Sequence, residues 1–146
     1  MYDGDFVNNK IGGNGKYYYK NGSYYIGQFK NGKINGKGIT YNKNGNIRYE
    51  GDFVNNKKEG NGKYFYKNGP YYIGAFKSGK RNGKGIIYNK NGNIMCEGDF
   101  INGKYEGNGK YIYKNGEYYI GQFKNGKRNG KGIKYYKNGN IKYTTN

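Results

Sequence analysis

Three pairs of acidic residues are the feature of this chain that most resembles catalytic machinery. Two carboxylates that lie close together can share the roles of acid and base. The pairs are Asp3/Asp5, Glu50/Asp52 and Glu97/Asp99. Each recurs at the same position of an internal repeat, and its first member is expected to face a lysine, so we interpret the pairs as structural. The chain has no histidine, which leaves no imidazole for proton transfer or metal binding.

The single cysteine and one glycine-rich stretch are the other candidates for chemistry. Cys96 stands where the other repeats have tyrosine and has no conspicuous catalytic partner, so we expect a packed small side chain rather than a reactive thiol. Residues 79–85 are similar to a phosphate-binding loop, but the Ser or Thr and the following helix are missing. We therefore predict no enzyme, no cofactor and no metal site.

These residues are positioned by a repeat of 23 to 24 residues that fills the 146-residue chain. The pattern Tyr-x-Gly-x-Phe, then Gly-x-Gly, then Asn-Gly occurs six times, with one departure from Tyr. Periods of this length are typical of repeat architectures, in which neighbouring units stabilise one another. We treat residues 1–146 as one array. Its six units begin at Tyr2, Tyr25, Tyr49, Tyr72, Cys96 and Tyr119, and Tyr143 opens a partial seventh.

Each unit is predicted to form a β-hairpin. With the first residue as offset 0, Tyr, Gly and Phe alternate at 0, +2 and +4 as in a strand, and +5 to +10 are turn-forming residues. A second strand is then expected to start at the Gly-x-Gly of +11 to +13. Pairing +2 with +13 makes Phe +4 face Gly +11 and offset 0 face +15. In even units the second turn, around Asn-Gly at +19/+20, is expected to hold one more residue.

Two offsets that should face each other, +1 and +14, support this register. They change type together, as direct cross-strand neighbours should. In odd units they are acid and lysine: Asp3/Lys16, Glu50/Lys63 and Glu97/Lys110. In even units both are isoleucine: Ile26/Ile39, Ile73/Ile86 and Ile120/Ile133.

Six hairpins predict an all-β fold: an elongated, single-layer, twisted antiparallel β-meander of about 12 strands, with one hairpin per repeat. Hydrophobic residues, at 33%, are too few for a globular two-layer core, but 19% aromatic residues suit a thin sheet. No apolar stretch is long enough to span a membrane, and no signal-peptide core follows Met1. With a single cysteine, this favours a reducing compartment. We expect a cytoplasmic protein that is not secreted.

The repeat resembles the MORN (membrane occupation and recognition nexus) repeat over the whole chain. The segment from Tyr119 to Gly132, YIGQFKNGKRNGKG, is a near-complete match. Units 1 and 3 depart at a loop glycine, with Asn9 and Asn56, and unit 5 departs with Cys96; we expect these to leave the fold intact. The resemblance implies an elongated ribbon with an aromatic-lined groove, acting as a non-enzymatic scaffold that is often dimeric and often peripheral at a membrane–cytoskeleton junction. Phosphoinositide or phosphatidic acid binding has been attributed to some members, and others are accessory arrays beside enzyme domains.

An aromatic stripe along the first strands is the candidate groove for a protein partner, cytoskeletal or membrane-associated. A single sheet cannot cover its own face, so the stripe could serve both as core and as partner surface. The alternative is that it is only the core of a thin ribbon. The stripe consists of Tyr2, Phe6, Tyr25, Phe29, Tyr49, Phe53, Tyr72, Phe76, Phe100, Tyr119 and Phe123.

The net charge of +18 is distributed in bands along the array. All nine acids lie in odd units, whereas 17 of the 27 Lys and Arg lie in even units. The even-unit loops are the candidate site for anionic phospholipid head groups, since each basic residue near an anionic leaflet contributes about 1 kcal/mol. The alternative is a solvated surface. Nucleic acid is not favoured, because only three of these residues are Arg. The loop residues are Lys30, Lys33, Lys37, Lys77, Lys80, Arg81, Lys84, Lys124, Lys127, Arg128 and Lys131.

The two ends of the array are predicted to be open edges. The chain begins with the first strand of a unit and ends soon after Tyr143. An uncovered edge strand offers unpaired backbone N–H and C=O groups to another chain. We therefore expect homo-association through open edge strands, or a longer native protein of which this array is a part.

Overall fold

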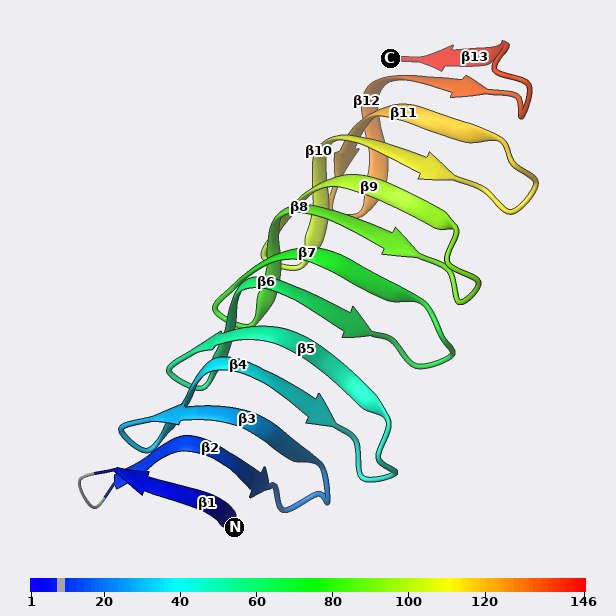
Figure 1. Ribbon diagram of the computed structural model, residues 1–146. Helices are drawn as coiled ribbons and strands as arrows, with labels where there is room; N and C mark the ends of the chain where they lie inside the picture. The colour runs from blue at the N-terminus through cyan, green and yellow to red at the C-terminus, as the bar shows by residue number, and fades with distance from the viewer. Residues whose placement is uncertain (8–9) are drawn as a thin grey trace.

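The computed structural model describes residues 1–7 and 10–146 as one open sheet of 13 antiparallel strands, with no helix in these residues (Figure 1). Every strand pairs with its neighbours in chain order, and the two termini lie at opposite ends of the ribbon (Figure 1). The predicted all-β meander is confirmed, and the start of the seventh unit adds a thirteenth strand. The strands are β1 (Tyr2–Val7), β2 (Lys10–Tyr18), β3 (Tyr24–Lys30), β4 (Lys33–Tyr41), β5 (Ile47–Val54), β6 (Lys57–Phe65), β7 (Tyr71–Lys77), β8 (Lys80–Tyr88), β9 (Ile94–Ile101), β10 (Lys104–Ile112), β11 (Tyr118–Lys124), β12 (Lys127–Tyr135) and β13 (Ile141–Thr145).

Each hairpin of units 2 to 6 closes with a two-residue turn at offsets +6 and +7. Both residues have positive φ, 50° at Asn31 and 80° at Gly32 for example, which is the type I′ geometry that matches the twist of paired strands. The turn is thus shorter than the sequence predicted: the second strand starts at +8 and not at the Gly-x-Gly. Asn56, which replaces the loop glycine in unit 3, adopts φ 72° without changing the turn. Asn9 lies outside the described residues.

The connections between hairpins are five residues long in odd and even units alike, for example 19–23 and 42–46. The prediction of a longer turn in even units was therefore wrong. The additional residue is instead a β-bulge: Thr40 pairs with Tyr49 and Tyr41 pairs with Ile47, which leaves Arg48 without a partner residue in the ladder. Met95 and Lys142 occupy the same position at the next two even-to-odd junctions.

The centre of the predicted register is confirmed in every hairpin. Gly at +2 pairs with Gly at +13, and the acid/Lys and Ile/Ile pairs at +1 and +14 are opposite each other. Beyond +2, however, a bulge shifts the register, so the prediction that Phe +4 faces Gly +11 of its own unit was wrong. Phe76 pairs with Arg81 in its hairpin and with Gly60 of the preceding unit, and Gly83 faces Phe100.

The core is a ladder of aromatic rings on one face of the sheet. Tyr25, Tyr49, Tyr72 and Tyr119 are 0% exposed. The Tyr72 ring lies over Gly85, where any Cβ would overlap it, and its hydroxyl donates to the Ala75 carbonyl oxygen at 2.8 Å. In unit 5 Tyr105, from a different offset, supplies the buried ring.

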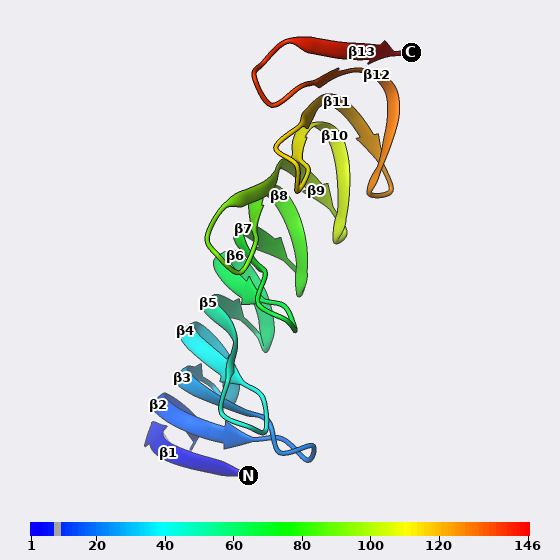
Figure 2. The same ribbon diagram turned by 90° about the vertical axis from the view of Figure 1, so that its right-hand side faces the viewer.

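Edge-to-face contacts join these rings within and between units. The Tyr49 ring contacts Phe53 of its own unit at 5.0 Å and Phe76 of the next unit at 5.1 Å between centroids. Full burial in a single layer requires the strands to curve around these side chains. The strands are accordingly arched, and the ribbon forms a long trough (Figures 1 and 2). We assign the buried rings to its concave face, because only that face of a single curved layer can enclose side chains.

The hairpin turns are tied to one another along one edge of the trough. The N–H of the +7 residue donates to the +9 carbonyl of the preceding unit: Gly79 to Lys58 at 3.0 Å and Gly103 to Arg81 at 2.8 Å. These bonds continue the ladder through the turns. The row of hairpin turns at offsets +6 and +7, with the residues that flank them, is hereafter called the turn edge. Its turns therefore have the same spacing as the strands that they connect.

Candidate functional site

The predicted aromatic stripe forms the core of the ribbon. Nine of its eleven side chains are buried, and only Phe6 at 67% exposed and the half-buried Tyr2 are not. A partner in the trough would therefore rest on side chains that lie above the stripe. The buried members are Tyr25, Phe29, Tyr49, Phe53, Tyr72, Phe76, Phe100, Tyr119 and Phe123.

A second aromatic layer, which the sequence reasoning missed, lies over this core. It consists of the tyrosines at +15 and +17 of the odd units. They lie on the same face as offset 0, because each +15 tyrosine pairs with the offset-0 residue of its own unit. Each pair makes an edge-to-face contact, with centroids 4.9 to 5.1 Å apart. The signal in the sequence is that odd units alone carry Tyr at both offsets. The members are Tyr17/Tyr19, Tyr64/Tyr66 and Tyr111/Tyr113.

The first pocket of this face lies in units 1 and 2, and no charged side chain lines it. It has a volume of about 360 Å³. Ile34, 5% exposed, and Phe29 form its floor, and Tyr17 and Tyr19 form one wall. The Asn56 side chain lies at its rim, where it accepts the backbone N–H of Ile34 at 2.9 Å. This pocket suits an apolar side chain.

The second pocket occupies the equivalent place in units 3 and 4 and is cationic. Its volume is about 380 Å³, with Tyr64 and Tyr66 as the aromatic wall. Lys58 and Arg81 stand where the first pocket has isoleucines, and Lys80 joins them at the rim. Burial lowers the pKa of Lys58, and the nearby Arg48 guanidinium lowers it further.

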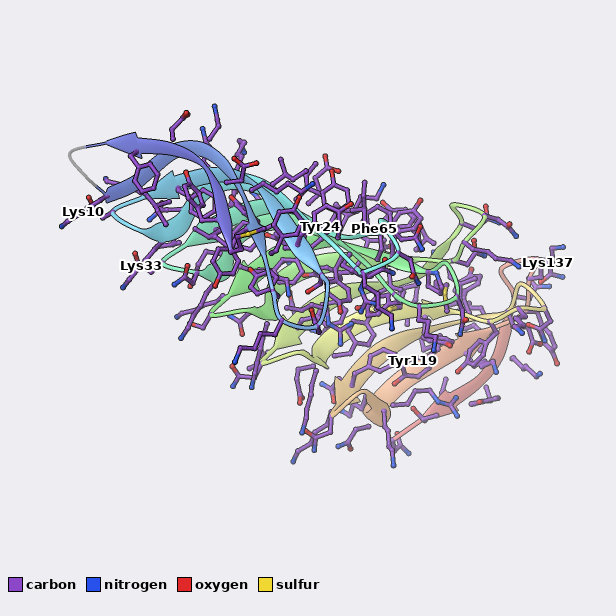
Figure 3. All side chains as sticks on the ribbon, turned by 90° about the horizontal axis from the view of Figure 1, so that it is seen from below. Lys10, Tyr24, Lys33, Phe65, Tyr119 and Lys137 are labelled. Atoms are coloured by element: carbon purple, nitrogen blue, oxygen red, sulfur yellow. The ribbon has the colours of Figure 1, made fainter. Side chains whose placement is uncertain are left out.

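The predicted lipid-binding loops divide into three groups in the structure. Six lysines, at +5 and +8, flank the turns of even units as cross-strand pairs and are exposed: Lys30/Lys33, Lys77/Lys80 and Lys124/Lys127. Lys10, Lys57 and Lys104 extend this row into the odd units, so every unit has a lysine at +8. Lys10 and Lys33 project from the turn edge, with Lys137 at the opposite edge (Figure 3).

The other predicted loop residues are placed differently. Lys37 and Lys84 lie on the convex face and pair with aspartates of the next unit, Lys37 with Asp52 at 2.9 Å and Lys84 with Asp99 at 3.6 Å. Arg81 and Arg128 turn toward the concave face: the Arg128 guanidinium donates to the Tyr143 hydroxyl at 2.8 Å and lies over the Tyr119 ring. Lys131 is exposed.

In two of the acidic pairs the second member has a structural contact, since Asp52 pairs with Lys37 and Asp99 with Lys84. Lys37 and the backbone N–H of Asn61 hold the pKa of Asp52 below its usual value, with Lys37 the larger cause. Lys16 and Lys63 face acids in the register, but their ammonium groups lie over aromatic rings, 4.6 Å from the Tyr24 centroid and 4.5 Å from the Tyr71 centroid.

The cysteine is buried, as expected for a packed side chain, and burial raises its pKa to about 11. Within residues 1–7 and 10–146, no cluster of Asp, Glu or Cys side chains has the arrangement of a metal site. None of the described segments is a helix of the length and apolarity needed to cross a membrane.

Comparison with known proteins identifies the repeat. The profile of the MORN repeat matches six consecutive stretches, residues 2–24, 25–47, 49–71, 72–94, 96–118 and 119–141. These are the units expected from the spacing of the tyrosines. A search of curated proteins finds no match to the chain.

Proposed function

We propose, from the premise that the chain belongs to the MORN repeat family, that it is a non-enzymatic scaffold whose trough binds a segment of a protein partner. MORN repeats are modules associated with protein and membrane interactions. The observation that carries the proposal is the second aromatic layer. These tyrosines are partly exposed above the core, and tyrosine is among the side chains that dominate many protein interfaces.

The spacing of this layer defines the kind of partner. Tyr17, Tyr64 and Tyr111 are equivalent residues 47 positions apart, which corresponds to four strands. Four strands span about 19 Å across a sheet. A segment that lies along the trough would meet a tyrosine pair at that interval, with the uncharged pocket under one part of it and the cationic pocket under the next. A partner that organises a membrane–cytoskeleton junction, or an enzyme domain beside the array, is compatible with this arrangement.

The proposal can be tested by selection of peptides from a display library. The parent protein is the bait, and the variant with Tyr17, Tyr64 and Tyr111 replaced by Ala is the comparison. We expect peptides that bind the parent and lose at least tenfold in affinity for this variant. The matched control replaces Tyr24, Tyr71 and Tyr118, which stack on the convex face with Tyr41, Tyr88 and Tyr135. Selected peptides that depend on the convex set instead would contradict a trough site.

A second candidate function, binding to anionic phospholipid, is supported by the lysine row of the turn edge. Nine exposed lysines at +5 and +8 follow this edge without an acid at either offset. Such a row would be attracted to an anionic leaflet, more weakly as salt increases. The array would then be peripheral at a membrane surface.

Vesicle co-sedimentation at two salt concentrations tests this candidate. Lys33, Lys80 and Lys127, all at +8, would be replaced by Glu and compared with the same change at Lys16, Lys63 and Lys110, all at +14. The +8 variant should lose binding to phosphatidic acid vesicles, and the +14 variant should retain most of it. Equal losses would mean that only the net charge matters.

Self-association through the edge strands is part of the same proposal. In the described sheet β1 and β13 each pair with one neighbour only. Their outer N–H and C=O groups can extend the sheet into a second copy. Light scattering over a range of concentrations is the test, and a monomer at the highest concentration would refute it.

A further inference from the structure

The two pockets of the trough are equivalent in position but differ in charge. Ile11 and Ile34 of the first pocket become Lys58 and Arg81 of the second, 47 residues later in each case. The surrounding tyrosine pair is kept: Tyr17/Tyr19 and Tyr64/Tyr66. Two apolar residues that line the first pocket thus correspond to two cations in the second, while the tyrosine wall is the same.

The Arg81 guanidinium is held in a defined orientation. One terminal nitrogen donates to the Tyr66 hydroxyl at 2.7 Å, and the other donates to the Gly103 carbonyl oxygen. The group lies over the Phe100 ring, 4.8 Å from its centroid. A guanidinium has five N–H donors, so these contacts leave three for a ligand, on a group that is already ordered.

Lys58 and Arg48 add positive charge beside it. The Lys58 ammonium lies over the Tyr64 ring at 5.1 Å from the centroid, and Arg48 donates to the Tyr64 hydroxyl at 3.1 Å. Among the described residues, no carboxylate forms an ion pair with Lys58, Arg48 or Arg81. The nearest acid in sequence, Glu59, accepts the backbone N–H of Ser78 instead.

This combination is energetically incomplete without an anion. Desolvation lowers the pKa of Lys58, because a cation that is partly removed from water and lacks a counter-charge is disfavoured. An anion in the pocket would remove that penalty and would receive charge-assisted hydrogen bonds from Arg81 and Lys58.

We propose that the pocket around Lys58, Arg81 and the Tyr64/Tyr66 pair receives the phosphate of a phosphorylated side chain in a partner segment. This rests on the proposed function, because the phosphate arrives on a peptide that lies in the trough. A phosphomonoester carries up to two negative charges and three acceptor oxygens, which matches several converging cations better than a single carboxylate does. The pocket opens on the concave face with Lys80 of the turn edge at its rim, so a vesicle measurement is needed to separate a phosphorylated side chain from a lipid head group.

The test uses NMR titration of the full chain with amide-capped phosphotyrosine and phosphoserine, with their unphosphorylated forms, and with inorganic phosphate. We expect saturable shifts confined to units 3 and 4 and to the adjoining turn at Asn102 and Gly103, with the phosphorylated amino acids binding at least fivefold more tightly than inorganic phosphate. The variant Lys58→Ile/Arg81→Ile takes its side chains from the first pocket, which shows that the fold accepts them. It should bind at least tenfold more weakly while its circular dichroism spectrum is unchanged.

Two further measurements separate the sources of the anion. The variant Lys33→Glu/Lys127→Glu, on the turn edge, should bind the phosphorylated amino acids as the parent does, apart from the salt-dependent loss expected of distant charge. Vesicles that contain phosphatidic acid should sediment the double-isoleucine variant as well as the parent. If the Lys58→Ile/Arg81→Ile variant loses vesicle binding, the pocket binds a lipid head group and the proposal is wrong. Inorganic phosphate that binds as tightly as the phosphorylated amino acids would also overturn it.

Failure of the phosphate pocket can be distinguished from failure of peptide binding in the trough. Display-selected peptides that need Tyr17, Tyr64 and Tyr111 but bind equally with or without phosphate would support the trough and overturn the phosphate pocket. Phosphorylated amino acids that bind at Lys58 and Arg81, with no peptide selected by the tyrosine layer, would support the pocket and refute the extended trough site.

Discussion

Tyr105 occupies the space that Cys96 leaves in the aromatic core. The Tyr105 hydroxyl donates to the Glu97 carbonyl oxygen and lies 3.1 Å from that of Lys110, and Tyr105 is 7% exposed. It lies over Gly109, where the ring of a tyrosine at position 96 would lie. The ring centroid is 4.4 Å from that of Phe123, so the contact to the next unit is kept. One ring per unit is therefore retained, although it comes from the neighbouring strand.

We predict strong coupling between these two positions. Cys96→Tyr alone should destabilise by about 1–3 kcal/mol, because two rings compete for one site. Tyr105→Ile, which installs the residue of units 1 and 2, should cost about 2–4 kcal/mol by leaving a cavity. The double variant should unfold within about 1 kcal/mol of the parent. Denaturant titrations of the four proteins measure the coupling, and additive effects would show that the two side chains do not share the site.

Phe76→Ala should destabilise the array by about 3–5 kcal/mol. Its ring is 5% exposed and contacts Tyr49 and Tyr72 in two different units. The control, Ile73→Ala on the convex face, removes a side chain that is 42% exposed and should cost under about 1 kcal/mol. Chemical denaturation is the measurement. Similar losses for both variants would mean that the core face does not dominate stability.

Two glycines of unit 4 should resist substitution for different reasons. Gly85→Ala would place a Cβ inside the Tyr72 ring, whereas Gly83 has φ 109°, which an L side chain rarely adopts. In a Tyr72→Ala background the additional cost of Gly85→Ala should therefore fall by more than about 1 kcal/mol, while that of Gly83→Ala should persist. Thermal unfolding of the paired variants tests this. A persistent cost at Gly85 would argue against the ring as its cause.

Stability should fall at alkaline pH. Burial raises the pKa of Tyr25 and of Tyr72 to about 12 and also raises the pKa values of Tyr49 and Tyr105. In the unfolded chain a tyrosine side chain has a pKa of about 10. Because the folded state holds these protons more tightly, the stabilisation is complete below about pH 10 and is lost as pH rises toward about 12.

Phenolate absorbance, followed together with circular dichroism, measures this transition. Tyr25, Tyr49, Tyr72 and Tyr105 should ionise as the β signal disappears. Tyr72→Phe should make the pH dependence shallower, and Tyr136→Phe, at a side chain that is 45% exposed, should leave it unchanged. Ionisation of all tyrosines before any loss of structure would contradict the assignment.

The sequence alone determined the strands, their order and the centre of their register. Alternation at offsets 0, +2 and +4 and the paired switch at +1 and +14 are local or nearest-neighbour effects, so they can be read along the chain. Asn-Gly likewise prescribes a tight turn through its own φ preference. The aromatic stripe was predicted from the same local alternation. Whether it forms the core or a groove depends on contacts between units, so that choice stayed open.

Only the tertiary structure decided what depends on curvature and on contacts between units. The bulge that turns Phe76 from Gly83 to Gly60 and the ladder bulge at Arg48 arise because arched strands of unequal path length must stay paired. Arg81 pairs with Phe76 in the ladder, so its side chain lies on the core face, against Tyr66 and Phe100, and not in the loop row. Tyr105 enters the core because Cys96 leaves room there, and such compensation across strands depends on volume, which the pattern of one unit does not encode.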